Sequence, residues 1–226
     1  MKLQLMKLSQ EQIQQVEDYL KNKDVEYIDL HLEVLDHIST AIEVNMTEKA
    51  ILFTEAFEEV KLIWNKTFSY KWTFWLGLTN GGSKLFIDNC VRIYKPILIK
   101  GGATLFLFLT LTLFFYKQIR VDFAPFQTFA KYLFLVFSII YIFLIYYWKY
   151  KINLAGKNTS YYYLYKKRVM PNIAITALFI FQILMFKDTY FDVSIFMFSY
   201  VFLFNLYIGF TFYSKHLSTL KKYKML

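Results

Sequence analysis

Long runs of apolar residues, separated by short polar stretches, dominate the chain after about residue 96. A helix needs about 20 residues to cross the hydrocarbon core of a bilayer. The third run is the shortest and the fourth is the longest. The pattern therefore predicts four membrane-spanning helices, at about residues 97–116, 129–148, 171–186 and 190–213.

Prolines and a short polar segment mark the ends of these runs. Pro96 precedes the first run and Pro171 opens the third. A proline in the first turn of a helix loses no hydrogen bond, because the N–H that it lacks has no partner there. The prolines therefore predict helix starts. Lys187-Asp188-Thr189 separates the last two runs and is typical of a tight hairpin.

Residues 1–66 follow a different pattern, in which apolar residues recur at helical spacing among polar ones. Ser9 and Gln12 have the spacing of a capping box, so a helix is expected from Ser9 to about Lys21. A second helix is expected at about residues 25–45 and a third from about Thr54, with Phe53 preceding its cap. A core built from about 60 residues is marginal. Self-association or docking onto a partner would help to stabilise this domain.

Residues 67–95 are too apolar for an exposed linker. The run Asn80-Gly81-Gly82 predicts a turn, and Ser83 can cap a following helix that reaches Tyr94. We expect this segment to lie along the cytoplasmic membrane interface as an amphipathic connector. Cys90 is then a small buried or interfacial hydrophobic residue, and acylation of its thiol is the alternative.

These elements predict an all-α protein in which a small cytoplasmic helical domain precedes a four-helix transmembrane bundle. Residues 1–66 form the cytoplasmic three-helix domain, residues 67–95 the interfacial connector and residues 96–226 the transmembrane domain. Composition agrees, since 57% of the residues are hydrophobic, whereas soluble domains contain roughly 45–50%.

Charge is distributed as unevenly as hydrophobicity. Residues 1–66 hold 13 of the 17 acidic and 7 of the 26 basic residues, a net charge of −6, against +15 for residues 67–226. Basic segments with few acids mark the cytoplasmic side of bacterial spans. With four spans, three such segments fall on one side: Lys84, Arg92 and Lys95; Lys149, Lys151, Lys157, Lys166, Lys167 and Arg168; and Lys215, Lys221, Lys222 and Lys224.

The charge pattern therefore predicts a multi-pass protein of the bacterial cytoplasmic (inner) membrane, with the N-terminus and the C-terminus in the cytoplasm. Residues 1–7 lack the apolar segment and cleavage site of a signal peptide, so the acidic head is expected to stay inside the cell. Nucleic-acid binding is the other explanation for the basic loops. They flank apolar spans and carry no nucleic-acid-binding motif, so we expect contact with the lipid bilayer and no direct contact with nucleic acid.

Candidate metal ligands occur in the second predicted helix, at His31, Glu33, Asp36 and His37. Glu33 and His37 are four residues apart and share a face, but the two histidines are six apart. The HExxH and ExxH spacings of known metal sites do not occur. We therefore expect structural or surface roles for these side chains and no metal site.

Other chemical motifs are equally weak. Cys90 is the only cysteine, so neither an intramolecular disulfide nor a Cys-based zinc site can form. The sequence contains no P-loop, no Gly-rich dinucleotide turn and no Ser-His-Asp arrangement, and His216 is the remaining histidine outside the head. We therefore assign no catalytic, cofactor-binding or metal-binding residue and no cofactor, and we do not expect an enzyme.

Four short segments within residues 8–66 form a further pattern: Tyr19-Leu20, Tyr27-Ile28-Asp29, Glu33-Val34-Leu35-Asp36-His37-Ile38 and Phe53-Thr54-Glu55-Ala56-Phe57. This pattern resembles the HAAS-type helical domain, which is similar to the DUF1700 and permease-prefix domains of bacterial permeases and small multi-pass membrane proteins. The resemblance implies a regulatory membrane protein, in some cases encoded beside a PadR-like transcription regulator.

The sequence thus favours a regulatory or signalling membrane protein whose acidic cytoplasmic head binds a protein partner or a second copy of itself. The alternative is an accessory subunit of a membrane transport (permease) complex. The centres of the predicted spans contain no Asp, Glu, Arg or His. Because such residues mark most ion pathways, an ion-coupled transporter is disfavoured.

Overall fold

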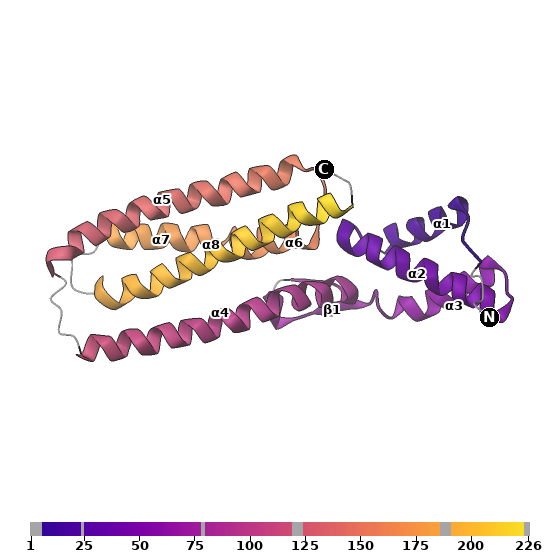
Figure 1. The fold of residues 1–226 in the computed structure, drawn as a ribbon, viewed down its shortest axis with the longest axis horizontal. Coiled ribbons are helices and arrows are strands. Elements are labelled where there is room, and N and C mark those ends of the chain that lie inside the picture. The colour runs from indigo at the N-terminus through magenta and orange to yellow at the C-terminus, as the bar shows by residue number, and fades with distance from the viewer. Residues whose placement is uncertain (1–5, 24, 78–79, 119–123, 186–190, 224–226) are drawn as a thin grey trace. The chain divides into compact units, whose positions relative to one another are not determined.

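The computed structural model describes residues 6–23, 25–77, 80–118, 124–185 and 191–223, and it is mostly helical (Figure 1). The chain forms two compact units, each described separately below. Unit 1 comprises residues 1–93 and 157–160, and unit 2 comprises residues 94–156 and 161–226. The predicted all-α class is confirmed, since the strands among the described residues are two segments of three residues each.

Unit 1 begins with three helices, α1 (Gln10–Lys21), α2 (Ile28–Lys49) and α3 (Phe53–Asn65). Each presents apolar residues at intervals of three or four, which places them on one helix face. The buried side chains are Val16 and Leu20 in α1, Leu30, Val34, Ile38 and Ile42 in α2, and Phe53, Ala56, Phe57 and Val60 in α3. Burying a large apolar side chain contributes about 1.5–3 kcal/mol, so this core is what holds the three helices together.

The ends of these helices differ in how well the sequence predicts them. Ser9 caps α1 as expected: its backbone N–H donates to Gln12 Oε1 at 2.8 Å, and the Gln12 N–H donates to Ser9 Oγ at 3.3 Å. Helix α2 ends at Lys49 rather than near residue 45. The next residue, Ala50, takes a left-handed conformation with φ 52°. Glycine usually occupies that position, so the sequence gives no stop signal there.

A small antiparallel hairpin follows α3. It consists of β1 (Tyr70–Trp72) and β2 (Gly81–Ser83), with the short 3-10 helix η1 (Phe74–Leu76) between them. The predicted turn at residues 80–82 is therefore wrong at its glycines, because Gly81 and Gly82 belong to β2. A Cβ on Gly81 would overlap the Tyr70 side chain, so in this structure the aromatic ring lies directly against the glycine.

Helix α4 (Lys84–Gln118) begins in unit 1, and its first turns are buried there. Phe86, Ile87 and Cys90 are each less than a tenth exposed. The Phe86 ring stacks on Tyr27, with ring centroids 4.2 Å apart. Residues 67–93 of the interfacial connector, which the sequence predicts over residues 67–95, thus belong to the same compact unit as the three helices of the head.

Residues 157–160 join unit 1 from a distant part of the chain. The Ile28 N–H donates to the Asn158 carbonyl at 2.9 Å, and the Ser160 N–H donates to Asp29 Oδ1 at 2.9 Å. The segment thereby caps the start of α2, whose N-cap residue provides no side-chain hydrogen bond. Helical periodicity cannot reveal this contact, because Asp29 and Ser160 are 131 residues apart.

In the part of unit 2 that the structure describes, the rest of α4 is followed by five further helical segments. These are α5 (Ala124–Leu154), most of α6 (Ser160–Leu164), the π-helix η2 (Tyr165–Val169), α7 (Asn172–Met185) and α8 (Phe191–Lys222). The four predicted spans fall in α4, α5, α7 and α8. The predicted hairpin at residues 187–189 lies outside the described residues.

The two prolines that the sequence predicts to mark helix starts behave differently. Helix α7 follows Pro171 directly, but Pro96 lies inside α4, so the prediction of a helix start at Pro96 is wrong. An internal proline removes one N–H donor, but the helix continues on both sides because no glycine or turn-forming residue flanks it. Tyr94 is 8% exposed and packs against Phe212 with ring centroids 6.2 Å apart, which holds the turn before the proline in place.

Within unit 2, α5 packs along α8. The buried residues Tyr141 and Ile145 of α5 and Ile208 of α8 lie in this interior. A Cβ on Gly209 would lie 3.0 Å from Ile145 Cδ1 and 3.2 Å from a ring carbon of Trp148, closer than about nine in ten real Cβ contacts. The absence of a side chain at Gly209 therefore lets α8 approach α5 closely.

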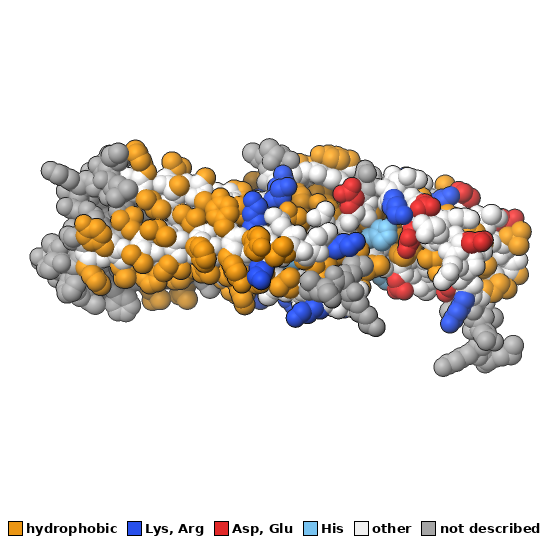
Figure 2. All heavy atoms as spheres, turned by 90° about the horizontal axis from the view of Figure 1, so that it is seen from above, with side chains coloured by type: hydrophobic (Ala, Val, Ile, Leu, Met, Phe, Trp, Pro, Cys, Tyr) orange, Lys and Arg blue, Asp and Glu red, His pale blue; other side chains and the backbone are white. Residues whose placement is uncertain are grey.

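Two helices among the described residues contain segments that are long and apolar enough to cross a membrane, Lys84–Phe114 and Tyr132–Leu154. In the apolar 18-residue stretch of each segment, only 6% of the residues are buried in the first and 22% in the second. Phe106 is 71% exposed and Phe143 is 68% exposed. Hydrophobic side chains spread over the helices of unit 2, while Lys and Arg gather at one end of them (Figure 2). Membrane association is thus supported for two helices, and the four-span topology stays a prediction.

Candidate functional site

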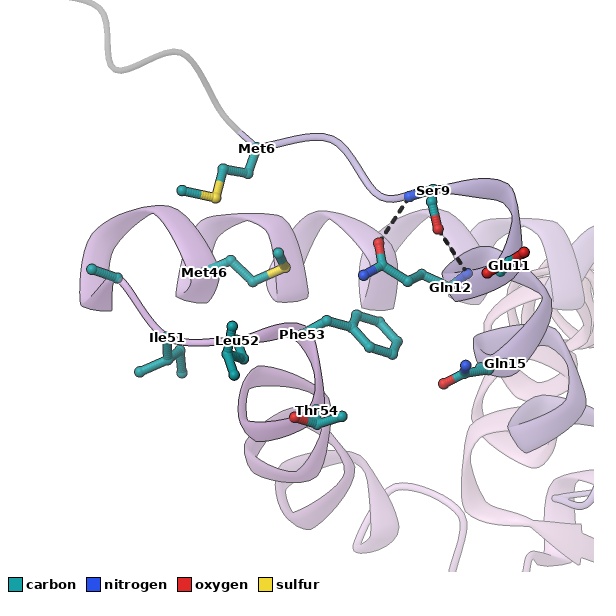
Figure 3. Close-up of a pocket in the computed structure, with 11 residues that line it drawn as sticks. Met6, Ser9, Glu11, Gln12, Gln15, Met46, Ile51, Leu52, Phe53 and Thr54 are labelled. Atoms are coloured by element: carbon teal, nitrogen blue, oxygen red, sulfur yellow. Dashed lines mark hydrogen bonds between the residues drawn. The ribbon is translucent and has the colours of Figure 1, made fainter.

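An open groove of about 600 Å³ lies on the surface of unit 1 (Figure 3). It is formed where the start of α1, the end of α2 and the α2–α3 link meet. Its lining residues are Met6, Ser9, Glu11, Gln12, Gln15, Met46, Ala50, Ile51, Leu52, Phe53 and Thr54. Residues from all three helices of the head and from the chain segments that precede α1 and α3 therefore contribute to one surface feature.

The segment before α1 is held in place by α2. The Met6 N–H donates to Thr47 Oγ1 at 3.0 Å, and the Leu8 N–H donates to Glu43 Oε1 at 3.0 Å. Leu8 is buried against the helices, which fixes the direction in which the chain enters α1. Met6, by contrast, is 53% exposed at the edge of the groove. The backbone on this side of the groove is therefore fixed, while an apolar side chain stays accessible.

The opposite side depends on the end of α2. The left-handed conformation of Ala50 ends the helix and turns the chain into the short link, which leads to α3. An ion pair between Lys49 and Glu59 joins the last turn of α2 to α3 across the link. Phe53 is 8% exposed and anchors the start of α3, whereas Leu52 is 71% exposed. The link thus presents one large apolar side chain to solvent from a well-anchored backbone.

The groove combines an apolar surface with a few polar groups. Its apolar surface comes from aliphatic, methionine and aromatic side chains, and unbranched methionines adapt to different partners. Its polar residues are hydroxyls, amides and one carboxylate, Glu11. Glu55 lies next to the groove in the first turn of α3, so acidic groups flank the apolar surface on two helices. The described lining residues include no cysteine, histidine or lysine that could act as nucleophile or base.

The candidate metal ligands in the sequence do not converge in unit 1. His31 Nδ1 lies 3.0 Å from the Val25 carbonyl and so fixes the chain entering α2. Glu33 Oε2 lies 4.0 Å from the Arg92 guanidinium, and the exposed His37 lies one turn further along α2. Asp36 is also exposed. Within the described residues, no group of three or more His, Cys, Asp or Glu side chains could hold a metal ion.

Helical periodicity alone does not predict the groove. Periodicity identifies the buried stripes, and the groove consists of residues at helix ends and in a link. A signal was present in the run Ile51-Leu52-Phe53, which is apolar although it joins two helices. One of these three side chains is buried and another is largely exposed. The sequence could therefore have suggested an apolar surface at this link, but not the part that α1 contributes to it.

Comparison with known proteins gives no relative for this chain. No family model matches the sequence, no curated protein matches it, and no solved structure matches the fold. The HAAS-type resemblance therefore stays a prediction, and the function has to be argued from the geometry of the two units.

Proposed function

We propose that this protein is a multi-pass protein of the bacterial inner membrane whose acidic cytoplasmic head docks a protein partner in the groove described above. In this proposal α4, α5, α7 and α8 cross the bilayer, and the chain serves a regulatory or signalling purpose. The observation that carries the proposal is the combination of an apolar groove on an acidic head with a second unit whose apolar side chains are exposed.

Unit 2 supports the membrane part of the proposal. Soluble proteins seldom expose large continuous apolar surfaces, because each exposed apolar group forgoes the free energy of burial. Phe106, Phe129, Ile139 and Phe143 are each at least 65% exposed on α4 or α5. Lipid chains would cover these side chains, and the basic residues at one end of the helices would lie at the anionic cytoplasmic surface.

Unit 1 supports the docking part. A partner that inserts an apolar side chain beside Leu52 would cover surface that water now contacts, which is a typical source of binding free energy. The net charge of −6 over residues 1–66 favours a partner with Lys and Arg beside its apolar anchor. We therefore expect an amphipathic, basic protein segment as the ligand, with an association rate that falls as salt concentration rises.

The test is site-specific photocrosslinking of the full-length protein in its native membrane. The photoreactive amino acid p-benzoyl-phenylalanine replaces Leu52 in the groove or, as a matched control, Leu62 on α3. Both leucines are about equally exposed, at 71% and 70%, but Leu62 does not line the groove. The expected result is a discrete adduct from position 52 that is absent from position 62.

The mass of the adduct distinguishes the possible partners. A soluble protein supports the regulatory proposal, a product of twice the protomer mass indicates self-association, and a permease subunit supports the transport alternative. Adduct formation at position 52 should also fall when Met46, which lines the groove from α2, is replaced by Ser. Identical adduct patterns from positions 52 and 62 would contradict docking in the groove.

A further inference from the structure

A π-helical turn, η2, lies in the basic stretch of unit 2 and is held firmly by its neighbours. π-helical turns are rare and often mark functional positions. The Tyr165 hydroxyl donates to the backbone carbonyl of Ile145 in α5. Val169 is fully buried, and one of its methyl groups lies 3.3 Å from where a Cβ on Gly209 of α8 would be. The turn is thus fixed between two long helices.

Arg168 lies in this turn with an incompletely paired side chain. Its Nε and Nη2 atoms are buried, and neither has a hydrogen-bond partner within the described part of the chain. A guanidinium is always charged at physiological pH, so both N–H groups need an acceptor. Because neither atom is accessible to solvent, water cannot supply one in this conformation.

The two nitrogens define a specific receptor geometry. Nε and Nη2 lie on the same edge of the planar guanidinium, and their N–H bonds point in parallel. This edge binds two oxygens of a phosphate or a carboxylate at once, which a lysine ammonium cannot do. The unpaired part of Arg168 is therefore the part that recognises oxyanions.

The other contacts of Arg168 do not use the hydrogen-bonding capacity of that edge. Its carbonyl accepts a hydrogen bond from Asn172 Nδ2 at 2.8 Å, which fixes the backbone. The guanidinium carbon lies 5.4 Å from the centre of the Tyr94 ring, so the aromatic ring faces the cation. A cation–π contact covers the flat face of a guanidinium, whereas hydrogen bonds form in its plane.

The surroundings favour a negatively charged ligand. Lys166 and Lys167 are exposed beside Arg168, and residues 149–170 contain no Asp or Glu to compensate the positive charge. Arg168 also lies three residues before Pro171, next to the start of the third proposed span. Phosphate groups of lipids are concentrated at that depth of a membrane.

We propose that Arg168 binds the phosphate group of a membrane phospholipid through its Nε–Nη2 edge, with Lys166 and Lys167 adding electrostatic attraction. Because both nitrogens are buried, phosphate binding requires the side chains that cover this edge to move. This inference rests on the membrane insertion of unit 2 but not on the groove of unit 1, so each proposal can fail without the other.

The test uses full-length protein purified in dodecyl maltoside, a detergent without phosphate. Thermal unfolding is followed by tryptophan fluorescence during titration with dioleoyl-phosphatidylglycerol, with dioleoylglycerol or with inorganic phosphate. The phospholipid should raise the unfolding midpoint in a saturable manner, because it binds the folded state only. Dioleoylglycerol has the same acyl chains without phosphate and should leave the midpoint unchanged.

The variants assign this effect to Arg168. Arg168→Gln should raise the half-saturating phospholipid concentration at least tenfold, whereas Lys151→Gln removes a charge from the same basic stretch and should change it less than threefold. If Arg168→Gln does not fold, Arg168→Lys decides, since it keeps the charge without the bidentate edge and should still weaken binding several-fold.

Three results would overturn the inference. One is an equal response of wild type and both Arg168 variants to the phospholipid. Another is equal stabilisation by dioleoylglycerol. Saturable stabilisation by inorganic phosphate without any further effect of the lipid would assign the site to free phosphate instead. Protein that is monodisperse without detergent would refute membrane insertion itself, which is a separate outcome.

Discussion

His216 shows how the surroundings of a single residue can differ from what its sequence neighbours suggest. It follows Lys215 in the basic C-terminal segment, yet its side chain is fully buried. The imidazole is hydrogen-bonded to the Ile152 backbone, and its ring centroid lies 6.2 Å from that of Tyr162. Burial lowers the pKa of His216 from 6.5 to about 4, although the hydrogen bond to Ile152 acts in the opposite direction. The folded protein therefore holds a neutral histidine at pH 7.

This shift predicts a pH dependence of stability. Between pH 6.5 and pH 4 the unfolded chain takes up a proton at His216 and the folded chain does not, so the free energy of unfolding falls as the pH falls. By pH 5 the loss should be about 2 kcal/mol. Unfolding of the detergent-solubilised protein at a series of pH values measures it. His216→Gln should remove this part of the pH dependence, and His37→Gln, at an exposed histidine, should keep it. Equal profiles for wild type and His216→Gln would contradict the assignment.

At this scale the sequence predicts local features better than distant ones. The capping pair Ser9 and Gln12 can be recognised because both partners lie within one helical turn. The burial of His216 and the unpaired edge of Arg168 depend on side chains that are far away in the sequence. Residue type and spacing carry no information about such contacts.

At the scale of elements, apolar periodicity gives the helices of the head and the long helices of unit 2, but not all their ends. Helix α4 continues through Pro96 because a single missing N–H does not end a helix that is packed on the residues before it. The hairpin of β1 and β2 could not be predicted from periodicity, because three-residue strands are too short to show alternation. The close approaches of helices depend on glycines. The sequence shows where these glycines are, but not which residues of other helices pack against them.

Gly101 provides the test at this scale. A Cβ there would overlap the ring of Phe204 on α8, and the Tyr200 hydroxyl donates to the Gly101 carbonyl at 2.6 Å. A Cβ on the neighbouring Gly102 would have no atom within 4 Å. Both Gly→Ala changes favour helix by about 1 kcal/mol, so their difference isolates the effect of packing. Gly101→Ala should be less stable than Gly102→Ala by about 1–3 kcal/mol.

Chemical unfolding of the two variants in detergent measures this difference. Phe204→Leu provides space at the contact, so adding Gly101→Ala to Phe204→Leu should cost less than adding it to the wild type. Equal stability of the Gly101 and Gly102 variants would show that α4 and α8 do not pack at this position.

At the scale of the whole molecule, the contrast in charge and hydropathy between the two parts of the sequence reappears as two compact units. The boundary nevertheless differs from the one that composition suggests. Residues 67–93 and 157–160 belong to unit 1, because aromatic packing and backbone hydrogen bonds tie them to α2. Composition changes gradually along a chain, whereas a structural boundary depends on which residues contact each other. The sequence therefore shows roughly where charge and hydropathy change, but not where one unit ends and the other begins.

The topology can be settled by labelling single cysteines in a Cys90→Ala background. Lys7→Cys and Lys221→Cys lie at exposed positions near the two ends of the chain, and both are expected in the cytoplasm. In intact cells, a membrane-impermeant maleimide should react with neither until the membrane is permeabilised. Labelling of one terminus but not the other in intact cells would mean an odd number of spans, which contradicts the charge pattern.

Labelling of the termini cannot separate four spans from two, because both numbers keep the two termini inside. Cysteines in the loops between the proposed spans make that distinction. Lys117→Cys, between the first two proposed spans, should be labelled from outside in both cases. Lys187→Cys, between the last two, should be labelled from outside only if α7 and α8 also cross the membrane. Protection of position 187 with labelling of position 117 would leave α4 and α5 as the only spans and place α7 and α8 on the cytoplasmic side. In that case the exposed apolar surface of α7, where Leu178 is 70% exposed, would need a cover other than lipid chains.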